Sequence, residues 1–177
     1  MLLSDGLANE IVSNLDHSEM CLTYLRSIKS YVESNIIINA NYVGVTPTGT
    51  PDPLNGPIQL NLTLTPSMVV GQQVTAFLRA LKEPNPNSFI QAVFSELIAD
   101  VISGPPTHTL TAKAIYQINS LSGSELDSLK KASDYVQAWK IICVPIVKTF
   151  LTLQVVPPTI PTVTASGTGV TTITAVL

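Results

Sequence analysis

The chain has 177 residues, within the size range of one domain, and a formal net charge of −3. Hydrophobic residues make up 45% of it, which excludes wholesale disorder, and charged residues only 12%, about half the usual share. Basic residues are scattered, with Lys130 and Lys131 the only adjacent pair, which argues against nucleic acid as a partner. A surface so poor in charge is typical of subunits that other chains cover after assembly.

Two amphipathic helices are predicted at the start of the chain. The first has an apolar residue at every fourth position, which places these residues on one helix face. A second helix is expected to begin at Asp16, with Glu19 completing a capping box. Apolar residues recur along it at helical spacing, and Arg26, Lys29 and Glu33 take the opposite side. The two apolar stripes consist of Leu3, Leu7, Ile11 and Leu15, then Cys21, Leu22, Leu25, Ile28 and Val32.

The pattern then changes to that of strands. Apolar and polar residues alternate from Ile36 to Tyr42 and, most clearly, from Ile58 to Thr65, which predicts an antiparallel hairpin. The connector, residues 46–56, holds three prolines and two glycines and is therefore expected to be a defined loop. A loop of this length in a small domain is usually functional or forms an interface.

Two further helices are predicted in the middle of the chain. Thr65 and Pro66 suit the start of the first, which should continue to Leu81. The second should extend from Phe89 to Ile102 with a wide apolar face. On this helix Glu96 and Asp100 lie four residues apart, and a solvated face is a more economical interpretation than a paired-carboxylate site.

The stretch 107–118 is predicted to be a strand or an extended loop. A last helix is expected to begin near Ser124, with Asp127 in the capping position, and to continue to Cys143. Pro145 should kink or end it. The most apolar stretch, residues 141–156, is too short to span a bilayer, so no membrane association is expected.

No charged residue follows Lys148. We therefore divide the chain into an α+β core domain, residues 1–148, with helices packed on a small antiparallel sheet, and a C-terminal extension or arm, residues 149–177. Uncharged strand-forming segments such as 170–176 are usually paired or covered. Residues 149–177 either add a strand to a neighbouring subunit or form a strand of the chain's own sheet. An arm predicts that a chain lacking 157–177 keeps a folded core.

The sequence contains no recognisable catalytic, metal-binding or phosphate-binding motif. His17 and His108 have no Glu or His at metal-ligand spacing, and no nucleophile elbow or phosphate-binding glycine loop is present. Asp52 stands between two prolines, which favours a rigid turn over a catalytic acid. We expect no enzymatic activity, no cofactor and no metal.

The segment from Asn41 to Gly56, NYVGVTPTGTPDPLNG, resembles loops in small virion proteins of tailed bacteriophages, especially contractile-tailed ones. The uncharged tail is similar to arms by which neck, tail and baseplate subunits clasp one another. The resemblance implies a virion protein, made in the host cytoplasm, that forms a multi-copy ring or wedge with copies of itself and other virion proteins. The candidate interface residues are Pro47, Pro51, Asp52, Pro53, Leu54, Val163, Val170, Ile173 and Val176.

An assembly chaperone or other cytoplasmic protein-binding module is the alternative. Such a protein would be monomeric or dimeric and absent from the final particle. An enzyme without a recognisable motif is the third hypothesis, and a pocket holding a strongly perturbed carboxylate or histidine would favour it.

Overall fold

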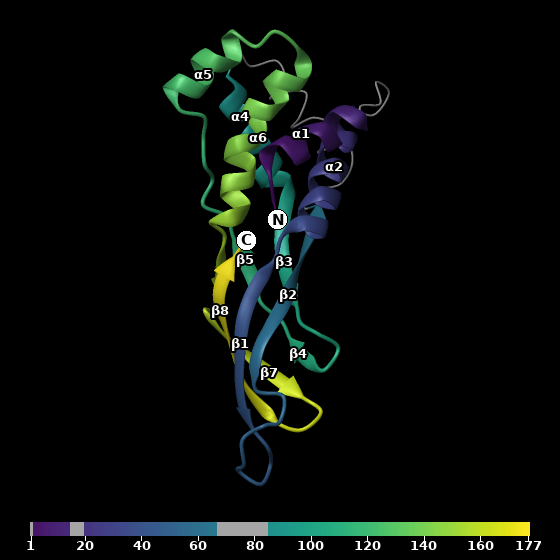
Figure 1. Cartoon of the computed structure of the whole chain (residues 1–177), viewed down its shortest axis with the longest axis vertical. Helices are drawn as coiled ribbons and strands as arrows, with labels where there is room; N and C mark the ends of the chain where they lie inside the picture. The colour runs from purple at the N-terminus through teal and green to yellow at the C-terminus, as the bar shows by residue number, and fades with distance from the viewer. Residues whose placement is uncertain (1, 15–19, 67–84) are drawn as a thin grey trace.

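Helices and strands gather at opposite ends of the molecule in the computed structural model, which describes residues 2–14, 20–66 and 85–177 (Figure 1). The predicted cap at Asp16, His17 and the helix predicted from Pro66 to Leu81 lie largely outside these residues. The helices are α1 (Ser4–Ser13), α2 (Met20–Asn35), α4 (Pro86–Glu96), α5 (Gly123–Lys130) and α6 (Tyr135–Leu151). The strands are β1 (Ile38–Val45), β2 (Gly56–Pro66), β3 (Leu97–Ser103), β4 (His108–Leu110), β5 (Lys113–Ile115), β6 (Gln154–Val156), β7 (Thr159–Thr164) and β8 (Thr168–Val176). The α+β class is confirmed.

The main sheet has six antiparallel strands in the order β3-β2-β1-β8-β7-β4. The predicted hairpin is confirmed, because β1 and β2 pair with Ile38 opposite Leu60 and Ala40 opposite Ile58. The two edge strands, β3 and β4, follow each other in the chain and touch, so the sheet curls toward closure (Figure 1). A small second sheet of β5 and β6 lies beside β3 and is tied to it by the Ile102 amide, which donates to the Ala112 carbonyl.

The C-terminal segment belongs to this sheet and is not an extension. Strand β8 lies between β1 and β7, and its pairing with β1 extends from Thr168 opposite Val45 to Val176 opposite Ile38. Ile37 and Leu177 then exchange two backbone hydrogen bonds of 2.9 and 2.8 Å. The predicted boundary at residue 149 falls inside α6. The prediction of an arm was therefore wrong, and the alternative, a strand of the chain's own sheet, is what the structure has. The reason is that β1 offers the uncharged tail a full-length partner within the same chain.

The predicted helix over 89–102 ends early. Helix α4 stops at Glu96, Leu97 has extended backbone angles, and the remainder forms β3. A long apolar run suits a buried strand as well as a helix. Strand pairing decides between a strand and a helix here. Strand β1 pairs with β2 only up to Leu60, and β3 pairs with the rest of β2, Asn61–Pro66. The interpretation of Glu96 and Asp100 as one solvated helix face was wrong, since Glu96 is buried at the end of α4 and Asp100 belongs to a strand.

The extended stretch after residue 107 is confirmed as β4 and β5, whereas the last predicted helix is divided in two. Ser122 and Glu125, and not Asp127, form the capping box of α5. Asp134 caps α6, which continues through Pro145 to Leu151. The helix is buried around Pro145 and packs chiefly against α1, and this packing compensates for the proline.

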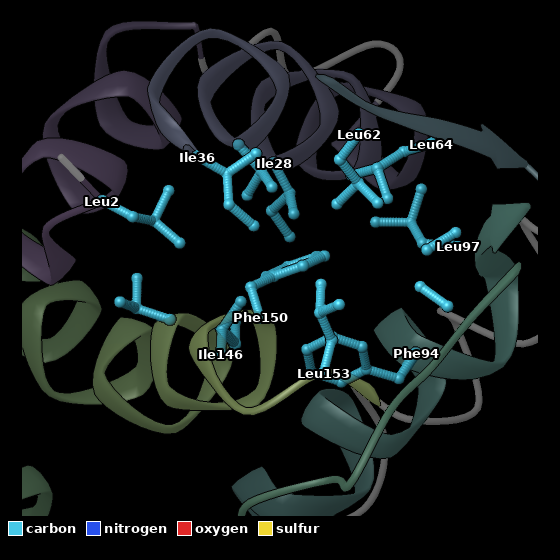
Figure 2. Close-up of a cluster of buried hydrophobic side chains, with 14 of the residues drawn as sticks. Leu2, Ile28, Ile36, Leu62, Leu64, Phe94, Leu97, Ile146, Phe150 and Leu153 are labelled. Atoms are coloured by element: carbon cyan, nitrogen blue, oxygen red, sulfur yellow. The ribbon is translucent and has the colours of Figure 1, made fainter. Parts of the chain in front are cut away.

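The hydrophobic core lies between the helices and the proximal half of the sheet. Figure 2 shows Phe150 of α6 in the middle of the cluster, with Ile28 of α2 on one side of it and Ile146 of α6 on the other. The predicted stripe residues Leu7, Ile11, Leu25, Ile28 and Val32 are buried, as is Cys143.

Lys29 and Glu33 of α2 do not simply face solvent. The Leu64 amide donates to Glu33 Oε1 at 2.6 Å, and Lys29 Nζ donates to the Leu64 carbonyl and to Glu33. This charged pair therefore attaches α2 to β2.

Deleting residues 168–177 should abolish cooperative folding. The reason is that β1 and β7 share β8 as a neighbour and would both lose it. Thermal unfolding followed by circular dichroism tests this, with a chain lacking only Leu177 as the control. A sharp transition in the shortened chain would contradict the central place of β8.

Candidate functional site

The two ends of the molecule differ in charge. Strands β1, β2, β7 and β8 contain no charged residue, and Asp52 is the only charged residue in 36–66 and 149–177 together. The helices and the segments next to them carry the described ion pairs, Lys29–Glu33, Asp127–Lys130, Asp5–Lys140 and Glu125–Lys148. We call residues 38–66 and 154–176, which form β1, β2, β6, β7, β8 and their connections, the sheet end; it projects away from the helices in Figure 1 and carries one charge, the buried Asp52.

Asp52 accepts hydrogen bonds from three separate segments of the chain. Its side chain is only 2% exposed. Oδ2 accepts from the Tyr42 hydroxyl of β1 at 3.0 Å and from Thr164 Oγ1 of β7 at 2.6 Å. Oδ1 accepts from Ser166 Oγ at 2.6 Å and from the Leu54 amide at 2.9 Å. One carboxylate therefore joins the loop 46–56 to β1 and to the β7–β8 turn.

The same contacts keep this carboxylate ionised. Burial alone raises the pKa of Asp52, but the hydrogen bonds from Ser166, Thr164, Leu54 and Tyr42 outweigh it and hold that pKa well below its usual value of 3.8. Burial, together with the neighbouring Asp52 carboxylate, raises the pKa of Tyr42, so its hydroxyl remains a donor. The cluster combines a permanent anion with permanent donors.

The loop 46–56 is fixed by its own hydrogen bonds, as its composition predicts. The Asp52 amide donates to the Gly44 carbonyl at 2.9 Å, and Asn55 bonds both the Gly44 amide and its carbonyl. Gly44 is required here because a Cβ at this position would lie 2.1 Å from the Tyr42 hydroxyl. Thr46 bonds to both Thr48 and Thr50 at the tip of the loop.

His108 lies next to the Asp52 cluster but does not form a catalytic set with it. Its ring meets Tyr42 edge-on at 4.9 Å between centroids, and Nδ1 bonds Thr107 Oγ1 at 2.9 Å. Its Nε2 is buried and forms no hydrogen bond with the part of the chain that the structure describes. The Ser166 hydroxyl donates to the Asp52 carboxylate, which is a weak base because its pKa is held low, and not to the His108 imidazole.

Neither the described residues nor known proteins point to a specific chemistry. Within residues 2–14, 20–66 and 85–177, no three His, Cys, Asp or Glu side chains gather as metal ligands would. In the same ranges, every helix is too short or too polar to cross a bilayer. Comparison with protein-family models, curated proteins and solved structures found no match.

The structure separates the predicted interface residues into three groups. Asp52 is buried and Leu54 half-buried, and the Leu54 amide donates to the Asp52 carboxylate within the loop. Pro47, Pro51 and Pro53 are exposed at the tip of the loop, and Val163 and Val170 are exposed on the sheet behind it. Ile173 and Val176 are half-buried and pack against the core.

Two exposed valines that the sequence interpretation did not select complete an apolar surface. Val43 of β1 lies opposite Val170 of β8, which lies opposite Pro161 of β7. In the next outward row, Val45 lies opposite Thr168, which lies opposite Val163. The four valines are 45–55% exposed. We call this surface the valine face: Val43, Val45, Pro161, Val163, Thr168 and Val170.

Glu96 is a second buried carboxyl, at the junction of α4 and β3. It is 1% exposed, and its Oε2 forms no hydrogen bond with the described residues. Burial raises the pKa of Glu96 above its usual value of 4.5. It stands outside the Asp52 cluster and forms no site with it.

Replacing Asp52 with Asn should lower the melting temperature by about 4–8 °C at neutral pH, because charge-assisted hydrogen bonds are lost. Since folding lowers the pKa of Asp52, the carboxylate contributes its full stabilisation above pH 3.8, and this stabilisation is lost as the pH falls through the pKa of Asp52 in the folded chain. The difference in melting temperature between the Asn variant and the wild type should therefore narrow as the pH falls below 3.8. Asp127→Asn, on an exposed helix, is the control. Equal melting temperatures at neutral pH would contradict the structural role of Asp52.

Replacing Glu96 with Gln should act in the opposite sense. A raised carboxyl pKa means that stability is greatest below 4.5 and falls as the pH rises through the folded value. The Gln variant cannot ionise and avoids this loss, so its melting temperature at neutral pH should exceed that of the wild type by on the order of 2–4 °C. Below pH 4.5 the variant should show no such gain. Melting curves over this pH range test it, and a gain that does not depend on pH would contradict the assignment to ionisation.

Proposed function

We propose that this chain is a structural subunit of a bacteriophage virion, in the neck, tail or baseplate, and that it assembles in several copies through its sheet end. The observation that carries the proposal is the neutral, internally hydrogen-bonded sheet end with its valine face. The resemblance of residues 41–56 to loops of tailed-phage virion proteins directs the proposal to a virion.

The physical properties of the sheet end suit permanent assembly. Burying uncharged Thr, Val and Pro residues avoids the large cost of desolvating ions. Because Asp52 and Asn55 already hold the loop, little conformational entropy remains to be lost on contact with a neighbour. The charges of the helical end remain in solvent and favour solubility before assembly.

The expected assembly mechanism differs from the one that an arm implies. An arm would order on a neighbour, and most of the binding energy would offset that ordering. Here the loop tip and the valine face are complete in each copy, and assembly joins preformed surfaces.

Mass spectrometry of particles purified from a culture that produces this chain should detect it in amounts comparable to the other structural proteins. The structural role requires the chain to remain in the finished particle. Absence from the particles, with the chain abundant in the lysate, would contradict the proposal and favour the assembly chaperone.

A further inference from the structure

Asn55 stands where the loop 46–56 enters strand β2, at the end of the molecule farthest from the helices (Figure 1). The last pair between β1 and β2 is Tyr42 with Gly56, and Gly44 lies two residues beyond it. Oδ1 of Asn55 accepts from the Gly44 amide at 2.6 Å, and Nδ2 of Asn55 donates to the Gly44 carbonyl at 3.1 Å. The side-chain amide of Asn55 therefore takes the place of a peptide group in the ladder.

The geometry of this corner requires the two residue types that occupy it. A primary amide offers a donor and an acceptor side by side, as Gly44 needs, whereas an ionised carboxylate offers acceptors only. Gly56 has a φ of +140°, a backbone conformation that residues with a Cβ rarely adopt. The fold thus places an asparagine directly before a glycine, and residues 55–56 are the only such dipeptide in the sequence.

An asparagine before a glycine readily reacts with its own backbone, because glycine has no side chain to shield its amide nitrogen. The Gly56 nitrogen forms a bond to Cγ of Asn55, and the bond from Cγ to Nδ2 breaks. The proton of the Gly56 amide leaves with Nδ2 as ammonia. Water then opens the resulting succinimide ring at either carbonyl. The products are aspartate, or isoaspartate, in which the backbone continues through the side-chain carbon atoms.

The closed loop opposes this reaction. Attack requires Cγ of Asn55 to approach the Gly56 nitrogen, whereas the two bonds to Gly44 hold the side-chain amide against β1. Asp52 supports the same arrangement, because its carbonyl accepts from the Asn55 amide at 3.1 Å and its amide donates to the Gly44 carbonyl at 2.9 Å. Asn55 is exposed, so hydrogen bonding and not burial protects it. Opening of the loop removes this protection.

From these contacts we infer that Asn55 is a site of spontaneous deamidation which the closed loop suppresses, and that the reaction keeps an opened loop from closing again. The aspartate product has no donor for the Gly44 carbonyl and adds a second carboxylate to the turn that holds Asp52. Isoaspartate also lengthens the backbone by one carbon atom ahead of β2, which disturbs the pairing of Tyr42 with Gly56. Conversion therefore marks, irreversibly, a chain whose loop has stayed open. This site is independent of the proposed function.

Peptide mapping by mass spectrometry tests the inference on the full chain, incubated at mildly alkaline pH with and without denaturant. In denaturant, Asn55 should deamidate well before Asn87 and Asn119, which precede serines. In the native chain its rate should be at least about tenfold lower, because the loop must open before reaction. Equal rates in the two conditions would overturn the protection by the closed loop. A rate in denaturant no higher than that of Asn87 would overturn the site itself.

Weakening the loop should raise the native rate at Asn55 selectively. Asp52→Asn removes the charge that holds the loop, and Thr164→Val removes one of its donors. The asparagine that the first variant introduces precedes a proline, whose nitrogen has no proton to lose. Below its melting temperature, each variant should deamidate several-fold faster at Asn55 and no faster at Asn87. Either variant suffices if the other does not fold, and Asp127→Ala, on the exposed side of α5, is the control. Wild-type rates at Asn55 in the loop variants would overturn the loop as the source of protection.

The aspartate form of the chain should be less stable than the wild type. Asn55→Asp should lower the melting temperature at neutral pH by about 3–6 °C, because the Gly44 carbonyl loses one of its two donors and faces a carboxylate. Asn61→Asp adds the same charge at an exposed position of β2 and should change the melting temperature by less than about 2 °C. A melting temperature of Asn55→Asp equal to that of the wild type would overturn the claim that deamidation keeps the loop open.

Discussion

The ionised carboxylate of Asp52 is the interaction on which the sheet end depends. It is the only charge there, and it accepts from residues that are as far as 114 positions away in the chain. A buried carboxylate is costly unless its oxygens are bonded, and here four donors converge on it. Because three segments supply these donors, β1, the loop and the β7–β8 turn can reach their positions only together.

The need to bond the Asp52 carboxylate is consistent with the many hydroxyl groups in the interior of the sheet end. Thr162 and Thr171 are buried and bond each other at 2.7 Å beneath the same strands. The helical end is held by aliphatic and aromatic packing, as around Phe150 in Figure 2. The sheet end is held by directional hydrogen bonds, which specify one arrangement of strands more strictly than apolar contacts do.

Local patterns predicted the parts of the fold that local physics decides. The alternation from Ile58 to Thr65 and the helical spacing of Leu25, Ile28 and Val32 led to the correct element types. The error at residues 97–102 arose because the partner of β2 is a matter of pairing between distant segments. The tail was left open between an arm on another subunit and a strand of the chain's own sheet for the same reason, since nothing near residue 170 shows that β1 lacks a neighbour.

The candidate site was predictable only in part. The composition of residues 46–56 indicated a defined loop, and Val163 and Val170 were selected as interface residues of the uncharged tail. Asp52 was assigned to a rigid turn, but its donors Thr164 and Ser166 could not be found without the fold. Val43 and Val45 were overlooked because alternation identifies the two faces of a strand but not which one is left uncovered.

The place of β8 beside β1 has a consequence for synthesis on the ribosome. Roughly 120 residues separate Val45 from Thr168, its partner, so β1 leaves the ribosome long before its neighbour exists. At about 5–20 residues per second, this edge stays unpaired for roughly 6–24 s. During that time the uncharged β1–β2 hairpin can pair with another nascent chain. Co-translational chaperones, or low synthesis rates, would therefore influence the yield of this protein more than its final stability does.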